Sequence, residues 1–420
     1  MKHAGAMLLG LLLLPGSSPR AAGPADSLPA RVTLEEALRL LNDVSPRTLA
    51  ERATVEVAAA ERVGARAHPN PSLSYDHLRL VSGESTGAET EHSLTLDQPL
   101  LLFGQRRARM DLADRNVEAE QSRVESALAQ RRLEVRQAFV ALVARQEGLR
   151  ILQESLTELR RVEEVVRGRA QVGDRSPYDV LRVETERKAL EVETMNAETD
   201  VDDASGQLAT LLGFPGWLPR AEGTLDPGDI PLDLDALWET AQQRRPALVE
   251  LRKRQSAAQE ELTVAHRERL PVPTLSAGGV QTEDVTGTSF LWGLSFPLPL
   301  FDRNKGAIAR ASAEIDAGTL ALEAETAEAR AEVERRLAIL VARRRILGTL
   351  EEGVVQRVPD LRRMAEDAYR EGRSDILDLL DASRSLKDLQ LLHIHQLEIT
   401  KEAEEDVIAA VGLDAPKVQG

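Results

Sequence analysis

The chain has 420 residues, enough for two or three globular domains or for one elongated domain. Acidic residues outnumber basic ones by 69 to 53, for a formal net charge of −16, so the chain has no overall basic character that would attract nucleic acid. It contains no cysteine, which excludes disulfides, thiolate metal sites, a cysteine nucleophile and a lipidated cysteine. Aromatic residues make up only 3%, while Ala, Leu, Glu and Arg dominate, a composition typical of long helices.

Residues 1–25 are predicted to be a secretory signal peptide. Lys2 precedes an apolar run at 6–14, and small residues follow at 21–25. The run is about half as long as the roughly 20 residues that a membrane-spanning helix needs. The rest of the chain is therefore expected to be exported, and any membrane that it enters must be entered by β-strands.

Most of the sequence occurs as two copies about 200 residues apart. Four of the matching pairs are Pro69-Asn70-Pro71 with Pro271-Val272-Pro273, Pro99 to Phe103 with Pro297 to Phe301, Gly173 with Gly372, and Asp179 with Asp378. Chance similarity between helices would not keep prolines and glycines in the same order. We therefore predict a tandem duplication of 26–213 and 232–413, with a linker rich in Pro and Gly at 214–231 and a C-terminal tail at 414–420.

Each copy is predicted to contain one very long helix. Residues 105–172 hold no proline, and Leu or Val recurs every seven residues from Leu128 to Leu156, the pattern of a coiled coil. The stripe returns at 304–371, where Pro359 is expected to kink the helix. A helix of this length extends for about 100 Å at 1.5 Å per residue.

Two shorter helices are expected beside the first long helix, at 33–68 and 178–212. Stacked end to end, they would match its length and form a rod, whereas a solenoid of short hairpins would not need a helix so long. The basic runs Arg131-Arg132 and Arg343-Arg344-Arg345 are interpreted as solvated faces or as pairs between subunits.

Two pairs of strands are predicted, at 72–81 and 90–98 in the first copy and at 274–283 and 288–296 in the second. Each strand has the length of a tilted strand that crosses a bilayer. Apolar side chains alternate in the last strand, and four of them are expected to face lipid: Phe290, Trp292, Leu294 and Phe296. The alternative is a soluble hairpin that caps a coiled coil.

Four strands cannot close a barrel alone, and an unpaired strand edge cannot face lipid. Three chains would supply twelve strands. The predicted fold class is therefore mainly α with a transmembrane β-barrel portion, in which duplicated long helical hairpins form an α-barrel beneath a trimeric, 12-stranded barrel.

Four motifs stand out along the chain: Thr33 to Leu38, Pro69 to Leu73, Gln98 to Gly104 and Gly173 to Leu181. On these motifs, the sequence resembles the TolC family of outer-membrane efflux channels over nearly all of the chain after the signal peptide. Asn70-Pro71 and Phe103 to Arg107 look most like the cobalt-zinc-cadmium efflux group. The resemblance implies a homotrimer in the cell outer membrane with a long periplasmic portion, a periplasmic adaptor (a membrane fusion protein) and an inner-membrane efflux pump as partners, and no cofactor.

The resemblance implies a passive exit duct of a tripartite efflux system, and heavy-metal cations are the expected substrates. No phosphate loop, nucleophile elbow or HExxH motif is present, so an enzyme is not expected. The alternatives are a periplasmic coiled-coil adaptor or scaffold without channel activity, and a metal-binding periplasmic protein.

The helical turns at the periplasmic end are the expected docking tips for the adaptor, with Val172, Gly173, Ser176, Gly372 and Ser374 as their candidate residues. Gly173 and Gly372 can end a helix in the left-handed conformation, and Ser176 or Ser374 can cap the next helix.

The resemblance also implies that acidic side chains at the tips close the tunnel and favour cations. Asp375 and Asp378 are the first gate candidates and Asp179 is the second. Like charges that threefold symmetry brings together repel each other, so a ring of aspartates would favour opening or attract cations.

The histidines are not expected to bind metal. His393 and His395 lie two residues apart on a predicted helix and so point to different sides. His68, His77 and His92 lie near the predicted strands, but typical zinc sites need three or four converging ligands.

Overall fold

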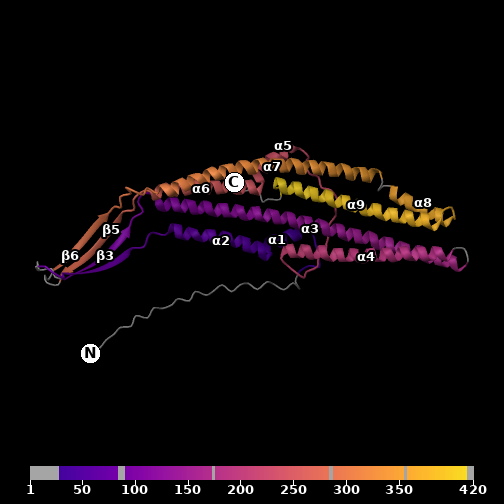
Figure 1. Ribbon diagram of the computed structural model, residues 1–420, viewed down its shortest axis with the longest axis horizontal. Helices are drawn as coiled ribbons and strands as arrows, with labels where there is room; N and C mark the ends of the chain where they lie inside the picture. The colour runs from indigo at the N-terminus through magenta and orange to yellow at the C-terminus, as the bar shows by residue number, and fades with distance from the viewer. Residues whose placement is uncertain (1–27, 84–89, 173–175, 283–286, 354–356, 414–420) are drawn as a thin grey trace, which may run out of the picture.

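The computed structural model describes residues 28–83, 90–172, 176–282, 287–353 and 357–413. The molecule is long and narrow, with a β-sheet at one end and helices that run away from it in parallel layers (Figure 1). The predicted signal peptide and C-terminal tail lie outside the described residues.

The two repeats have closely similar orders of elements. The first contains α1 (Leu34–Asp43), α2 (Pro46–Arg66), β2 (Ser72–Arg79), β3 (Thr90–Pro99), α3 (Gln105–Gln171) and α4 (Pro177–Leu212). The second contains α5 (Leu234–Arg244), α6 (Pro246–Glu268), β5 (Thr274–Thr282), β6 (Gly287–Ser295), α7 (Lys305–Gly353), α8 (Val358–Arg370) and α9 (Ile376–Val411). The strands and the first long helix lie within two residues of their predicted bounds.

Two predicted helices are each divided in the structure. The helix expected at 33–68 is wrong as one element, because α1 ends at Asp43 and α2 begins at Pro46. Proline has no N–H to donate to the preceding turn, so Pro46 starts a helix rather than continuing one. The helix expected at 304–371, with a kink at Pro359, is described as two elements: α7 extends as far as Gly353, and α8 has Pro359 in its first turn.

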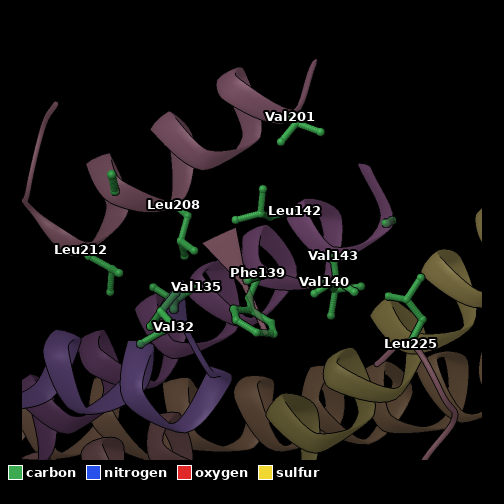
Figure 2. Close-up of a cluster of buried hydrophobic side chains, with 14 of the residues drawn as sticks. Val32, Val135, Phe139, Val140, Leu142, Val143, Val201, Leu208, Leu212 and Leu225 are labelled. Carbon is green, nitrogen blue, oxygen red and sulfur yellow. The ribbon is translucent and has the colours of Figure 1, made fainter. Parts of the chain in front are cut away.

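The heptad stripe of α3 forms the centre of the helical core. Leu128, Val135, Leu142, Leu149 and Leu156 are all at least nine-tenths buried. Around the middle of α3, the stripe packs against Leu208 and Leu212 of α4, as Figure 2 shows. Burying a leucine or valine stabilises the fold by about 1.5–3 kcal/mol, so this seam holds the long helices together. None of the helices among the described residues is long and apolar enough to cross a membrane.

The linker between the repeats is fixed by a small sheet that the sequence did not predict. β1 (Arg31–Val32) pairs in parallel with β4 (Arg220–Ala221). The side chain of Gln146 on α3 donates a hydrogen bond to the Ala221 carbonyl at 2.8 Å and accepts one from the Ala221 N–H at 2.9 Å. These contacts attach the linker to the middle of α3.

The main sheet has four antiparallel strands in the order β2-β3-β5-β6. The first repeat contributes the hairpin β2–β3 and the second contributes the hairpin β5–β6, and the pairing of β3 with β5 joins the two hairpins. β2 and β6 form the two edges of the sheet within the chain.

Candidate functional site

The register of the main sheet separates its side chains into two faces of different chemistry. Directly paired residues of neighbouring strands point to the same face, and successive residues of one strand point to opposite faces. We define the apolar face by Leu73, Tyr75, Leu94, Leu96, Leu275, Ala277, Phe290, Trp292 and Leu294. We define the polar face by Ser72, Ser74, Asp76, Glu91, Ser93, Thr95, Asp97, Thr274, Ser276, Ser289 and Ser295.

The apolar face is open to the surroundings of the protomer. Phe290 and Trp292 on the edge strand β6 keep 76% and 72% of their surface exposed, and Leu294 keeps 51%. Phe296 lies one residue beyond the end of β6 and is half exposed. The four residues predicted to face lipid therefore belong to one exposed, apolar surface.

The polar face carries three carboxylates, Asp76, Glu91 and Asp97. Asp97 accepts a hydrogen bond from Ser276 on the neighbouring strand, and Asp76 accepts one from Ser93 at 3.5 Å. No Lys or Arg occurs at the positions of the four described strands that share this face. The face is therefore negatively charged and is otherwise lined mostly by hydroxyl groups and small residues, with Leu78, Val280 and Leu291 as its large apolar members.

The first helical tip lies at the end of the molecule furthest from the sheet (Figure 1). Val172 ends α3 and is 80% exposed. Ser176 caps α4, since its hydroxyl accepts a hydrogen bond from the Tyr178 N–H at 3.1 Å. The carboxylate of Asp179 in turn accepts a hydrogen bond from the Ser176 N–H at 3.3 Å. The predicted cap is confirmed, and Gly173 lies outside the described residues.

The second tip differs from its prediction by one residue. Asp375, not Ser374, caps α9, because the Asp375 carboxylate accepts a hydrogen bond from the Leu377 N–H. Asp378 completes a capping box by accepting a hydrogen bond from the Asp375 N–H at 3.2 Å. Gly372 has a φ of +71°, the left-handed conformation predicted for it. A carboxylate is as good an N-cap acceptor as a hydroxyl group. Its negative charge is also stabilised by the positive end of the helix dipole.

The three gate candidates therefore share a local role. Asp179, Asp375 and Asp378 each accept a hydrogen bond from a backbone N–H at the start of α4 or α9. They also place negative charge at the tips. Each aspartate therefore stabilises the start of its own helix, and that helix in turn fixes where the carboxylate lies at the tip.

A network of buried ions, which sequence reasoning missed, lies midway along the molecule on α9. Glu404 is 1% exposed, and it accepts hydrogen bonds from Arg344 of α7 at 2.8 Å and from Lys401 at 3.1 Å. It also accepts one from the Gly228 N–H of the linker at 2.9 Å. The interpretation of Arg344 as part of a solvated face or a pair between subunits is wrong, because its partners lie within the chain.

For two other carboxyl groups of α9, Glu402 and Asp406, the nearby positive charges and hydrogen bonds do not fully offset the cost of burial. Burial, followed by the nearby carboxylates of Glu398 and Asp406, raises the pKa of Glu402 above its usual 4.5. Burial also raises the pKa of Asp406, although Arg336 and Gln137 oppose the shift.

Four of the histidines make side-chain contacts with one another or with nearby Tyr and Glu residues. His77 and His92 stack with ring centroids 4.7 Å apart, and the Tyr75 hydroxyl lies 2.7 Å from His92 Nδ1. His393 contacts Glu351 at 3.1 Å, whereas His395 contacts Glu398 at 3.4 Å. Within the described part of the chain, no three His, Asp or Glu residues converge in a way that could hold a metal ion.

A duplicated helical bundle that ends in a sheet with one exposed apolar face has the form of an outer-membrane channel. A family model described as outer membrane efflux protein matches residues 38–214 and 237–413, so the chain belongs to that family. It is an outer-membrane protein with a long periplasmic helical portion, and the resemblance to TolC-family channels is confirmed.

Curated relatives of the chain include two metal-resistance proteins. The sequence is 25% identical to the cobalt-zinc-cadmium resistance protein CzcC of Cupriavidus metallidurans over 410 residues, which cover 96% of this chain and 94% of that protein. It is 24% identical to the nickel-cobalt-cadmium resistance protein NccC of Alcaligenes xylosoxydans xylosoxydans, with 76% of this chain and 71% of that protein covered.

Solved structures with the same fold include three membrane proteins. A membrane protein from Pseudomonas aeruginosa superposes with a TM-score of 0.71 at 21% identity, over 95% of this chain and 99% of that one. CusC superposes with a TM-score of 0.71 at 16% identity, over 96% of this chain and 99% of that one. The outer membrane protein VceC from Vibrio cholerae gives 0.69 at 18% identity, over 90% and 96%.

Proposed function

We propose that this chain is the outer-membrane channel of a tripartite efflux system, a passive exit duct for substrates that an inner-membrane pump and a periplasmic adaptor deliver. The observation that carries the proposal is the division of the sheet into an exposed apolar face and a hydroxyl-rich, acidic face. In a membrane channel built from strands, the first kind of face meets lipid and the second lines the passage. The family match over both repeats favours a channel over a periplasmic adaptor or scaffold.

The channel we propose is a homotrimer. The sheet leaves the outer edges of β2 and β6 unpaired within the chain, and unpaired edges are not stable in hydrocarbon because their N–H and C=O groups lack partners. If β6 of one protomer pairs with β2 of the next, three chains make a closed, 12-stranded barrel. The long helices would continue below it as a periplasmic α-barrel.

We propose heavy-metal cations as the substrates. Two curated relatives are named for resistance to cobalt, cadmium and zinc or nickel. The polar face of this chain carries Asp76, Glu91 and Asp97 without a basic residue, and acidic rings favour the entry of cations over anions. The chain has no ATP-binding loop, so the energy for transport would come from the pump.

The helical tips are the proposed gate and adaptor-docking site. Asp375, Asp378 and Asp179 would form the gate, where threefold symmetry would bring equivalent carboxylates together and attract cations. The adaptor would dock on the turn residues around them: Val172, Gly173, Ser176, Gly372 and Ser374. Val172 supports this assignment because an apolar side chain that is 80% exposed is suited to a protein contact.

The test combines the mass and the single-channel conductance of the chain purified from outer membranes in mild detergent. A trimer that conducts cations better than anions supports the duct, and a non-conducting monomer overturns it. The gate is tested by Asp375→Asn with Asp378→Asn, because asparagine can still cap a helix but carries no charge. Reduced cation preference supports the gate, whereas a preference equal to that of the control Asp43→Asn, on α1, overturns it.

A further inference from the structure

The apolar face does not extend over the whole height of the sheet. Its paired residues form three rows, which reach from Leu275 and Leu294 near the helices to Tyr75, Leu94 and Phe290. The next two rows away from the helices are polar and contain His77, His92, Gln281 and Thr288, followed by Arg79 and Thr90. Hydrocarbon contact within the sheet is therefore limited to the half nearer the helices.

This apolar height is too small for a bilayer. Four residue steps separate Leu294 from Phe290, which is about 14 Å along a strand at about 3.4 Å per residue. A strand tilted by about 40° rises only about 10 Å over that length, whereas the apolar band of an outer-membrane barrel is about 25 Å tall. Because the two described rows beyond Phe290 are polar, the apolar surface can continue without interruption only on the side of the helices.

Two uncharged segments continue the apolar surface in that direction. Residues 100–104 follow β3 and residues 296–301 follow β6, and neither segment contains Asp, Glu, Lys or Arg. Both make the same tight turn, in which the Leu102 N–H donates to the Leu100 carbonyl and the Leu300 N–H donates to the Leu298 carbonyl. The two repeats therefore present equivalent structures where the sheet meets the long helices (Figure 1).

The large side chains of these segments are unusually exposed. Phe301 keeps 97% of its surface exposed and Leu298 keeps 74%, while Leu300 and Leu102 are about two-thirds exposed. We name the six exposed leucine and phenylalanine residues of the two segments the collar: Leu102, Phe103, Phe296, Leu298, Leu300 and Phe301. Large apolar side chains that are exposed at the same end of a sheet mark a surface that another apolar partner covers.

We propose that the collar lies in the inner leaflet of the outer membrane and contacts lipid there. This inference rests on the proposed function, which places the apolar face of the sheet in that membrane. The collar continues this face without a charged residue between them, and it supplies the apolar height that the three rows lack. Charges resume at Asp302 and Arg106, where the chain leaves the hydrocarbon for the lipid head groups.

Nitroxide labels at single cysteines test the proposal, and the absence of native cysteine makes each label unique. The labelled variants are Phe301→Cys in the collar, Trp292→Cys in the sheet and Val172→Cys at the helical tip. The trimer is reconstituted into phosphatidylcholine vesicles. Collision rates with oxygen, which concentrates in hydrocarbon, and with a water-soluble nickel complex are then measured by electron paramagnetic resonance. We expect the oxygen-to-nickel ratio at 301 to match that at 292 and to exceed that at 172 several-fold.

The outcomes separate the collar from the channel. A water-like ratio at 301 with a lipid-like ratio at 292 overturns the collar alone, as does a label at 301 that neither reagent reaches, because another subunit then covers it. A water-like ratio at both positions removes the sheet from the membrane and overturns the proposed function as well. A second variant, Leu300→Asp with Phe301→Asp, should reduce the outer-membrane fraction several-fold relative to the control Leu392→Asp on α9, and an equal fraction would contradict the proposal.

Discussion

Arg384 of α9 and Glu186 of α4 lie 198 residues apart, one residue away from equivalent positions of the two repeats, and are joined by a salt bridge. The guanidinium donates two hydrogen bonds to the carboxylate, at 2.6 and 3.1 Å. Lys387 of α9 and Glu193 of α4 make a similar pair at 2.7 Å, about one turn further along α9 and two turns further along α4. The duplication therefore gave two related helices opposite charges at facing positions, and these charges join the repeats near the tips.

We expect the Arg384–Glu186 pair to contribute about 0.5 kcal/mol, because partly exposed ion pairs are screened by water. Reversing one charge, in Glu186→Arg or Arg384→Glu, should lower the thermal midpoint slightly, and the double reversal should restore it. The measurement is a double-mutant cycle by circular dichroism at low and high salt. A double variant less stable than both single variants would refute a direct interaction.

Removing the Glu404 carboxylate should be far more costly. Glu404→Ala leaves Arg344 and Lys401 without their buried partner and the Gly228 N–H without an acceptor. Breaking a buried ion pair by deleting one member typically costs about 3–5 kcal/mol, and the partial exposure of the two cations places the expected loss near 3 kcal/mol. Chemical denaturation measures it. The matched control is Glu352→Ala, an exposed glutamate on α7 that should change stability little.

Glu402 should show the opposite behaviour and depend on pH. Its raised pKa means that the folded chain binds the proton more tightly than the unfolded chain, so ionised Glu402 lowers stability above its folded-state pKa. Glu402→Gln is therefore expected to raise the thermal midpoint at pH 7.5. Below the unfolded value of 4.5, the difference from the parent chain should disappear. A variant that is less stable than the parent at pH 7.5 would show that the ionised group is stabilising.

The glycines that follow α4 and α9 offer a matched comparison. Both have positive φ, +87° at Gly213 and +73° at Gly412. A Cβ at 412 would lie 2.8 Å from the Arg244 carbonyl oxygen, whereas one at 213 would lie 3.1 Å from the Pro46 side chain. Both alanine variants should lose about 1 kcal/mol from the left-handed backbone, and Gly412→Ala should lose more because backbone cannot move aside easily. Equal denaturation midpoints of the two variants would contradict an additional steric cost at position 412.

Variants of Asp375 at the tip should distinguish the effect of helix capping on stability from the effect of the carboxylate charge on conductance. Asp375→Ala removes the N-cap of α9 and is expected to cost about 1 kcal/mol, while Asp375→Asn should cost little. Thermal denaturation reports capping, and conductance reports charge. An asparagine variant as unstable as the alanine variant would show that the carboxylate acts on the helix through its charge rather than through its hydrogen bond.

Periodic features of the sequence predicted the fold well. The seven-residue stripe of α3 and the alternation of β6 extend over many residues, so their signals add up. The pairing of β1 with β4 involves two residues in each strand, too few for any period, and was missed. Pro46 is present in the sequence of the first helix, but the prediction did not use its missing N–H to end the preceding helix.

The site was less predictable because it depends on which helices become neighbours. Arg344 and Glu404 lie 60 residues apart, and no local pattern distinguishes them from the exposed charges around them. At the second tip, Ser374 and Asp375 are adjacent residues that both suit an N-cap. Only the backbone conformation of the turn determines that Asp375 takes that role.

The central pair of the main sheet has a consequence for the order of folding. Pro99 pairs with Thr274 and Glu91 with Thr282. β3 can therefore pair with β5 only after a strand almost half a chain length away has been brought beside it. Contacts so distant in sequence form slowly compared with helices and hairpins. We expect each helical repeat to be largely formed while its hairpin is still separate, so that the apolar face comes together late, close to the membrane that receives it.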